Sequence, residues 1–284
     1  MKRIILSGAN GFIGKSILNH LKGVETDVID REKGMDITAS SWFHEFKDSY
    51  DAFIHLAGKT DVVASFSNPA EFYRINTIGT LNIAQFCKEK HIPLVIYANS
   101  YPYGVPNYLP VNETHPINPQ SPYQRSKQFA EDLLLDCPDI TTVSCRLFNV
   151  YGPNQPGHLL IPEIIEQVLG DQYEIEVKDL MPKRDYIYVE DVVNLFSAIL
   201  DARINHSTII NVGTGKSHSV KDVIDQVQKV LGTNKPIQSR KEVRKNEVVD
   251  CYANINKVKK MFDWKPEFQL DEGLKKWMAQ LKIR

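Results

Sequence analysis

The amino-acid sequence predicts an α/β fold with a doubly wound parallel sheet and a smaller C-terminal lobe. Short apolar runs alternate with helical patterns through the first half of the chain. The run at 93–98 (PLVIYA) is continuously apolar, which is typical of a strand covered on both faces. A glycine-rich turn joins the first strand to the first helix. Strands that alternate with helices form βαβ units, and these assemble into a parallel sheet.

The expected elements follow one another in a regular order. Strands are expected at residues 3–7, 26–30, 51–55, 93–98 and 141–147, and helices at 11–21, 71–90 and 121–135. After residue 152 prolines interrupt this rhythm, and the helical patterns lie at 160–169, 190–202, 218–231 and 270–281. We therefore expect one domain over residues 1–152 and part of 184–215, and a second lobe mainly over 153–284, without a flexible linker between them.

The charge balance argues against several classes of protein. The 284 residues include 34 basic and 35 acidic side chains, which gives a formal charge of −1. A binder of nucleic acid or membrane surfaces needs a large positive field, so neither partner is expected. No apolar run reaches the ~20 residues of a membrane span, and the apolar start is too short for a signal peptide, so we expect a cytoplasmic protein. The cysteine and histidine spacings match no metal-binding motif, so no metal site is expected.

Three glycines stand between the first strand and the first helix. Gly8 permits a tight turn, Gly11 lets the backbone approach a pyrophosphate, and Gly14 allows close packing of the helix on the strand. The helix N-terminus then offers free N–H groups and a positive dipole to phosphates. A glycine-rich turn without a ligand is the plain alternative, but the order strand, glycines, helix favours a Rossmann-type domain that binds NAD or NADP.

The residues after the second strand bear on the choice of cofactor. Asp30 lies 16 residues after Gly14, where an acid can hydrogen-bond the adenosine ribose of NAD. Arg31 follows directly and can instead pair with the 2′-phosphate of NADP. Asp36 and Ile37 come soon afterwards and are expected near the adenine. The sequence therefore leaves the choice between NAD and NADP open.

Tyr123 and Lys127 are the strongest catalytic candidates. Their i, i+4 spacing on a predicted helix places the phenol and the ammonium on one face. A lysine cation stabilises a phenolate, and such a tyrosine can exchange a proton with a sugar hydroxyl or carbonyl. The YxxxK pattern alone is common and also fits an exposed amphipathic face. In a chain that also carries the glycine turn, the catalytic interpretation is favoured.

Together these features resemble the extended short-chain dehydrogenases/reductases that act on nucleotide sugars, the group of epimerases, dehydratases and 4-ketoreductases. The resemblance spans nearly the whole chain. The motifs that carry it are GANGFIG at 8–14, HLAG at 55–58, NTIGT at 76–80, YANSYPYG at 97–104, SPYQRSK at 121–127, RLFNVYGP at 146–153, RDYIYVEDVV at 184–193, NVGTG at 211–215, RKNE at 244–247 and ANINKVKKMFDWKP at 253–266.

The resemblance implies roles for individual residues. Tyr123 would donate or accept the proton, and Lys127 would bind the nicotinamide ribose and tune Tyr123. The expected dinucleotide-binding residues, besides Tyr123 and Lys127, are Gly8, Asn10, Gly11, Phe12, Ile13, Gly14, Asp30, Arg31, Asp36, Ile37, Leu56, Ala57, Gly58 and Asn76. For the nucleotide sugar, Asn149 would contact the phosphate, Arg184 and Arg244 would clamp the diphosphate, and Glu247 would hold the nucleotide ribose. A homodimer through helices at about 71–90 and 120–136 is also implied.

The chain departs from the family pattern at its Ser/Thr position. The family places a serine or threonine four residues before the tyrosine of the Tyr103-Gly104 pair, and here that residue is Asn99. Either the next residue, Ser100, takes the role or Asn99 supplies the hydrogen bond, and we favour Ser100. Dehydratases carry Asp-Glu after the Ser/Thr, whereas this chain has Ser100-Tyr101. Dehydration is therefore disfavoured.

Three reactions or roles remain after these arguments. The short segment between Asp30 and Asp36 resembles nucleotide-sugar 4-ketoreductases more than 4-epimerases, so the leading expectation is NAD(P)H-dependent reduction at C4 of an NDP-4-keto-6-deoxyhexose. The alternative is an NAD-dependent NDP-sugar 4-epimerase of the UDP-glucose or UDP-N-acetylglucosamine type. A non-catalytic dinucleotide-binding protein is the further alternative, since Asn99 departs from the family pattern.

Overall fold

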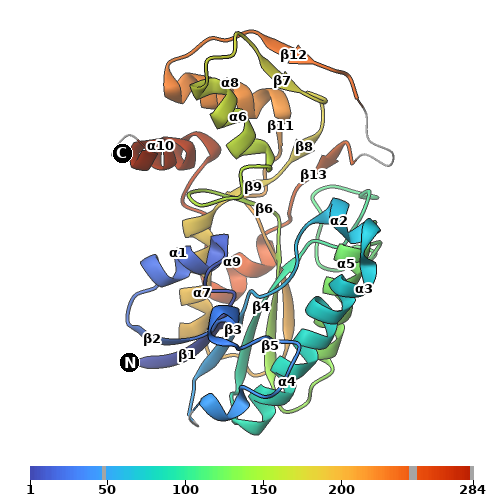
Figure 1. The fold of residues 1–284 in the computed structure, drawn as a ribbon, viewed down its shortest axis with the longest axis vertical. Coiled ribbons are helices and arrows are strands. Elements are labelled where there is room, and N and C mark those ends of the chain that lie inside the picture. Colours follow the sequence, from blue (N-terminus) through green and yellow to red (C-terminus); the bar gives the residue numbers. More distant parts are fainter. Residues whose placement is uncertain (47–48, 243–247, 282–284) are drawn as a thin grey trace. The chain divides into compact units, whose positions relative to one another are not determined.

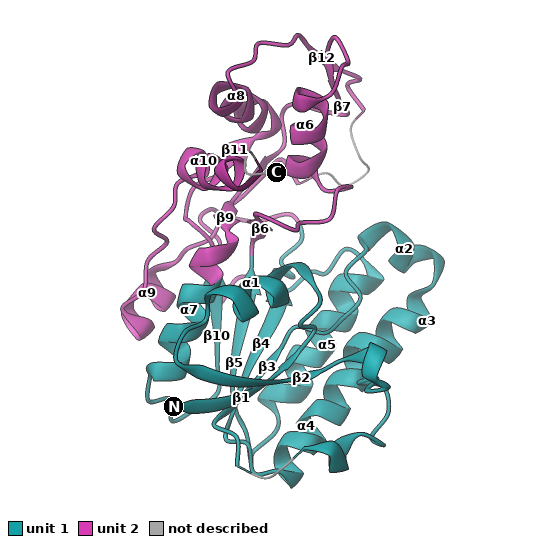
Figure 2. Cartoon of the chain, turned by 60° about the vertical axis from the view of Figure 1, so that its left-hand side comes forward, with its two compact units in different colours: residues 1–104, 116–147, 193–211 teal, residues 105–115, 148–192, 212–284 magenta. Residues whose placement is uncertain are grey.

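The computed structural model describes residues 1–46, 49–242 and 248–281 (Figure 1). The chain forms two compact units (Figure 2). The first contains residues 1–104, 116–147 and 193–211, and the second contains residues 105–115, 148–192 and 212–284. Within the described ranges, no helix combines the length and the apolar character that a membrane crossing requires.

The first unit is built on a six-stranded sheet with the order β10-β5-β4-β3-β1-β2. The strands are β1 (Lys2–Ser7), β2 (Val24–Ile29), β3 (Ala52–His55), β4 (Leu94–Ser100), β5 (Thr141–Leu147) and β10 (Thr208–Val212). All neighbouring pairs from β2 to β5 are parallel, which confirms the doubly wound prediction. The strand order reverses at β1 and β3, because the chain leaves β1 to one side and returns to the other. Ligands bind at such a switch point, beyond the carboxyl ends of the strands.

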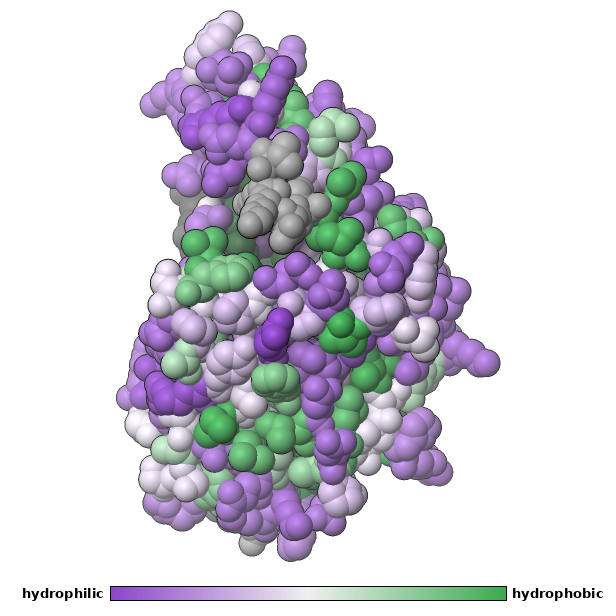
Figure 3. All heavy atoms as spheres, turned by 90° about the vertical axis from the view of Figure 1, so that its right-hand side faces the viewer, coloured by the Kyte–Doolittle hydropathy of each residue, from purple (hydrophilic) through white to green (hydrophobic). Residues whose placement is uncertain are grey.

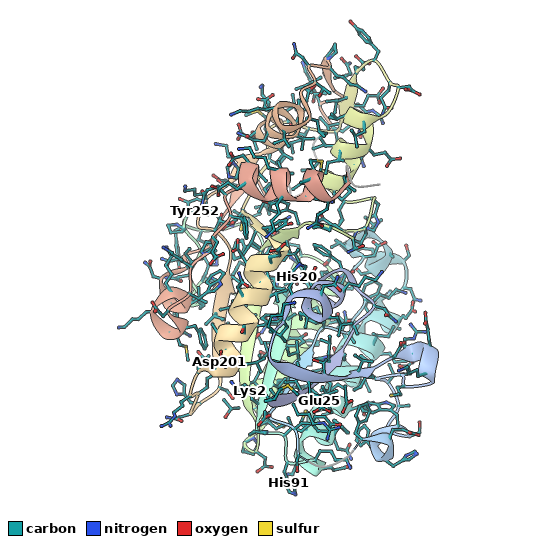
Figure 4. All side chains as sticks on the ribbon, turned by 90° about the vertical axis from the view of Figure 1, so that its left-hand side faces the viewer. Lys2, His20, Glu25, His91, Asp201 and Tyr252 are labelled. Atoms are coloured by element: carbon teal, nitrogen blue, oxygen red, sulfur yellow. The ribbon has the colours of Figure 1, made fainter. Side chains whose placement is uncertain are left out.

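Helices cover both faces of this sheet (Figure 1). One face carries α1 (Phe12–His20) and α7 (Val189–Asp201), and the other carries α3 (Pro69–Phe72), α4 (Gly79–Glu89) and α5 (Pro122–Leu135). The short helix α2 (Val62–Ser67) precedes α3. The ammonium of Lys2, at the start of β1, forms a 2.6 Å ion pair with Asp201 at the end of α7 (Figure 4). This ion pair joins the start of β1 to the C-terminal end of α7.

The predicted helix over 71–90 is three consecutive segments in the structure. It starts at Pro69, because Asn68 caps α3 by accepting a hydrogen bond from the Glu71 backbone and proline fits the first helical position. A π-helical turn, η3 (Tyr73–Ile78), then leads into α4. Turns of this kind are frequent at functional sites.

Aromatic side chains fill the core between the sheet and α4. Phe86 of α4 is fully buried, and its ring lies 5.1 to 6.2 Å from the rings of Trp42, Phe43, Phe46 and Phe53. Three of these rings, those of Trp42, Phe43 and Phe46, belong to the segment around η2 (Phe43–Glu45), which has little regular structure of its own. Burial of large aromatic surface therefore fixes the connection between β2 and β3.

The second unit combines small sheets with four helices in its described part. Its strands pair as β6 (Asn149–Tyr151) with β9 (Tyr186–Tyr188), β7 (Ile175–Val177) with β12 (Ile237–Ser239), and β8 (Lys183–Arg184) with β11 (His218–Ser219) and β13 (Asp250–Cys251). The helices are α6 (Leu160–Leu169), α8 (Val220–Leu231), α9 (Asn256–Phe262) and α10 (Leu270–Leu281). A capping box of Ser219 and Asp222 starts α8, and Gly232 in the left-handed conformation ends it.

Candidate active site

The glycine turn at the end of β1 is packed backbone against backbone. Gly8 has φ +77°, and a Cβ at this position would lie 2.7 Å from the backbone nitrogen of Ala57. A Cβ on Gly14 would lie 2.7 Å from the Cα of Ala9. Gly11 is the N-cap of α1. Because glycine has no side chain, no cap accepts the N–H groups of the first helical turn. Glycine is required at positions 8 and 14, and the turn leaves a cradle of N–H groups at the switch point of the sheet.

Asp30 is held beside this turn by two hydrogen bonds. Its carboxylate accepts from the backbone N–H of Glu32 at 2.9 Å and from the side-chain amide of Asn10 at 3.2 Å. The neighbouring Arg31 side chain is 79 % exposed and lies 3.8 Å from Asp36. A backbone hydrogen bond from Thr38 lowers the pKa of the Asp36 carboxyl despite the partial burial of that group. An ordered carboxylate thus stands at the end of β2, next to the glycine turn.

Asn76 holds the loop that follows β3. Its side-chain oxygen accepts from the N–H of Lys59 at 2.7 Å, and its amide nitrogen donates to the carbonyl of Lys59 at 3.0 Å and to Ser126 at 2.9 Å. A Cβ on Gly58 would lie 2.9 Å from the Asn76 oxygen. Asn76 is buried, so its position behind the Ala57-Gly58 segment is fixed. The direct contact with the dinucleotide that the sequence indicated stays a prediction.

Tyr123 and Lys127 lie on α5, whose first turn is capped by Ser121. Lys127 is buried, and its ammonium donates to the carbonyl of Ala98 at 2.8 Å and lies 4.1 Å from the ring centre of Tyr97. Burial lowers the pKa of Lys127 to about 7, against the opposing effect of the Glu131 carboxylate. Burial also raises the pKa of Tyr123, whereas a hydrogen bond with Ser100 lowers it.

Asn99 and Ser100, the two candidates for the Ser/Thr role, have different surroundings. Asn99 is buried, donates its amide to Glu131 at 2.8 Å and accepts the N–H of Ser100 at 2.8 Å. The hydroxyl of Ser100 is buried and lies near enough to Tyr123 to lower the pKa of its phenol, and no partner at hydrogen-bonding geometry is found for this hydroxyl among the described residues. The structure therefore brings Ser100, Tyr123 and Lys127 together at the ends of β4 and α5.

The residues expected to hold the nucleotide sugar belong to the second unit. Asn149 lies on β6, where its backbone N–H donates to the carbonyl of Asp185 at 3.0 Å. Arg184 lies on β8, and its guanidinium donates to the carbonyls of Lys183 at 2.8 Å and Val248 at 2.5 Å. Arg244 and Glu247 lie outside the described residues. The substrate-binding roles of all four stay predictions.

Sequence reasoning missed several polar residues buried behind the site. Ser7, His55, Thr80 and Ser126 are all at most 1 % exposed and are hydrogen-bonded to one another or to the loops above. Their positions in the sequence could have indicated them. His55 and Thr80 lie in the HLAG and NTIGT motifs, and Ser126 lies between Tyr123 and Lys127. No group of three metal-ligating side chains comes together among the described residues.

Residues 4–213 match the sequence model of the NAD dependent epimerase/dehydratase family. The chain belongs to this family, and it is an enzyme of the extended short-chain dehydrogenase/reductase type that uses a nicotinamide dinucleotide. The residues present fit such a group, since the glycine cradle and the ordered Asp30 supply the N–H groups and the carboxylate that a dinucleotide needs.

Relatives match most of the length of the chain. It is 33 % identical to a putative UDP-glucose 4-epimerase of Methanocaldococcus jannaschii, over 97 % of this chain and 98 % of the relative. It is 30 % identical to the UDP-glucose 4-epimerase of Homo sapiens, over 82 % and 75 % of the two chains.

Solved structures confirm the fold. RMD from Pseudomonas aeruginosa complexed with NADPH has a TM-score of 0.90 at 25 % identity and covers 100 % of both chains. The Thermus thermophilus UDP-glucose 4-epimerase complexed with NAD has a TM-score of 0.85 at 27 % identity and covers 99 % of both.

Proposed function

We propose that this enzyme is an NAD-dependent 4-epimerase of a nucleotide-activated hexose of the UDP-glucose type. The observation that carries the proposal is the likeness along the full chain to UDP-glucose 4-epimerases. The sequence alone favoured net reduction of a 4-keto sugar, with epimerisation as the alternative, and the relatives favour the alternative. The supporting geometry is the cluster of Ser100, Tyr123 and Lys127 at the ends of β4 and α5.

The proposed chemistry assigns the proton to Tyr123. When bound, the nicotinamide supplies the hydride acceptor and donor for C4. Tyr123 takes the proton of the 4-hydroxyl as that carbon is oxidised and returns it when the other epimer forms. Its pKa is raised by burial, so it acts as a base only with positive charge beside it. Lys127, one helical turn further along α5, supplies that charge, and the Ser100 hydroxyl orients the reacting oxygen.

We infer that the preferred dinucleotide is NAD. Glu32 and Asn10 order Asp30 next to the glycine turn. There its carboxylate can accept hydrogen bonds from both hydroxyls of the adenosine ribose. A 2′-phosphate at this place would meet that negative charge. Arg31, which could offset the repulsion, is mostly exposed and lies beside Asp36.

A 4-ketoreductase is the second candidate, and two observations favour it. The segment between Asp30 and Asp36 is a single short turn, η1 (Arg31–Lys33), and the TM-score of 0.90 is to a structure complexed with NADPH. The two reactions make different demands on the cofactor. An epimerase regenerates its dinucleotide in each turnover and gains from retaining it, whereas a ketoreductase has to exchange it after every reduction.

The first experiment identifies the dinucleotide released from the purified protein and follows UDP-glucose by NMR without added cofactor. We expect near-stoichiometric NAD⁺ and the appearance of UDP-galactose. The Tyr123→Phe variant is the matched control: it should keep the dinucleotide and lose turnover by at least about 100-fold, since positioned acid–base groups contribute that much or more. An empty protein that consumes NADPH with a 4-keto sugar nucleotide would support the ketoreductase. Dinucleotide binding without either reaction would support a non-catalytic role.

We also propose that two copies of the chain associate through α4 and α5. Large apolar side chains are exposed on this face of the first unit, and Figure 3 shows them gathered there. Exposed fractions are 44 % for Leu81 on α4, 47 % for Ile78 on η3 and 48 % for Phe129 on α5. Apolar groups clustered in this way mark association surfaces. Light scattering should give twice the chain mass, and Phe129→Glu should give monomers; a monomeric wild-type protein would exclude the proposal.

A further inference from the structure

We propose that His55 is a positioning residue whose imidazole, protonated on Nε2, connects the dinucleotide-binding loop after β3 to the catalytic helix α5. The connection is a chain of hydrogen bonds inside the first unit. It rests on the dinucleotide-binding part of the proposed function and is independent of which sugar is the substrate.

The direction of the hydrogen bonds follows from one fixed acceptor. The hydroxyl of Thr80 lies 2.6 Å from the carbonyl oxygen of Asn76, and a carbonyl can only accept. The single Thr80 proton is therefore used in that bond. Nε2 of His55 lies 2.9 Å from the same hydroxyl, so the imidazole has to donate its proton from Nε2.

The other ring nitrogen then has to accept. His55 is fully buried, and both its burial and the nearby Lys127 ammonium keep it neutral, so it carries one ring proton. Nδ1 lies 2.7 Å from the hydroxyl of Ser7, which donates to it. The Ser7 oxygen in turn accepts the backbone N–H of Ala57 at 3.3 Å. The donor and the acceptor of each of these hydrogen bonds are thus defined.

The series of hydrogen bonds continues from Asn76 to the catalytic helix. The Asn76 side chain holds both the N–H and the carbonyl of Lys59, and it donates its remaining proton to the hydroxyl of Ser126. Ser126 donates to the carbonyl of Tyr123 at 2.8 Å. The loop residue Gly58 is therefore flanked by two clamps, one on Ala57 and one on Lys59, and His55 joins the clamps to each other.

Burial gives this arrangement its consequence. Each residue whose side chain takes part in these hydrogen bonds is at most 1 % exposed. A buried group that loses its partner is costly, so removing one member leaves its neighbours without a low-energy alternative. We therefore expect a break at Thr80 to loosen the loop after β3, although Thr80 itself is buried on α4.

The test compares Thr80→Val with Thr80→Ser. Valine keeps the size of threonine and removes the hydroxyl, whereas serine keeps the hydroxyl and loses a methyl group. After release of bound dinucleotide, NADH fluorescence titration should show roughly tenfold weaker binding for T80V and nearly unchanged binding for T80S. In the wild-type protein, two-dimensional ¹⁵N–¹H NMR of the histidine rings should show His55 protonated on Nε2, and T80V should change that signature.

Two outcomes would overturn the proposal. One is a wild-type His55 protonated on Nδ1. The other is T80V and T80S binding NADH equally well. Circular dichroism melting of each variant without dinucleotide separates a misfolded protein from a loosened loop. Neither readout needs a sugar nucleotide, so absence of epimerisation would refute the proposed reaction and leave this result standing.

Discussion

Asn99 donates its side-chain amide to the carboxylate of Glu131 across 2.8 Å, and both residues are buried. Glu131 also forms an ion pair with Arg146 at 2.5 Å, and Arg146 donates to the hydroxyl of Tyr103 at 3.0 Å. A buried carboxylate needs this number of donors because its desolvation is costly. An asparagine at position 99 therefore supports a buried charge, and the neighbouring Ser100 is left to face Tyr123.

Ser100→Ala and Asn99→Ala should separate these two functions. Ser100→Ala removes the hydroxyl that faces Tyr123, so we expect kcat to fall about 100-fold or more with little change in unfolding free energy. Asn99→Ala leaves Glu131 short of one donor, so we expect a loss of about 1–3 kcal/mol in urea denaturation. If instead Asn99→Ala abolishes turnover in a stably folded protein and Ser100→Ala is fully active, Asn99 holds the Ser/Thr role.

The parts of the fold that sequence reasoning predicted depend on local patterns. The run at 93–98 is apolar at every position because its strand is covered on both faces, and it appears as β4 (Leu94–Ser100). The glycine spacing predicted the turn at Gly8 because the positive φ of this residue and the closeness of the Ala57 backbone leave no room for a Cβ. The Tyr123–Lys127 spacing predicted that both side chains share one face of a helix, because this feature too depends only on residues close together in sequence.

The missed parts depend on contacts that are distant in sequence. The strand β10 (Thr208–Val212) lies beside β5, about sixty residues earlier, and its short run does not by itself indicate which strand it pairs with. The polar residues behind the site were missed because their meaning lies in their partners. Glu131 on α5 looks like an ordinary helix-surface acid until β4 and β5 bring Asn99 and Arg146 against it.

Removing the Lys127 charge should stabilise the protein without dinucleotide. The folded-state pKa of Lys127 is lowered to about 7, whereas the unfolded chain keeps its proton to about 10.5. The unfolded state therefore binds more protons between these values, and the penalty for the native state is complete below pH 7. Lys127→Met should abolish turnover yet raise the unfolding free energy at pH 6, on the order of a few kcal/mol, and the gain should fade toward pH 10. Denaturant titrations at pH 6 and pH 9.5 measure this, and an equal gain at both would contradict it.

His55 should contribute to acid unfolding. Burial lowers its pKa to about 3, whereas the unfolded side chain titrates near 6.5. The unfolded state takes up the proton first, so native stability falls as the pH drops from 6.5 toward 3. His55→Gln removes the titrating group and keeps a donor of similar reach. The variant should lose less stability than the wild type between pH 6.5 and pH 4; identical pH slopes would show that His55 is protonated equally in both states.

Gly14→Ala should disrupt the glycine turn itself. The added methyl group would meet the carbonyl oxygen of Gly8 and the Cα of Ala9, both of which are backbone atoms that cannot move aside independently. We expect a loss of about 1–3 kcal/mol in stability, since overpacking costs this much, together with at least tenfold weaker NADH binding. Gly157→Ala is the matched control, because a Cβ there meets nothing within 4 Å and its φ lies outside the left-handed region. It should stay within about 0.5 kcal/mol of the wild type and bind NADH normally. Normal NADH binding by Gly14→Ala would mean that the turn does not approach the dinucleotide.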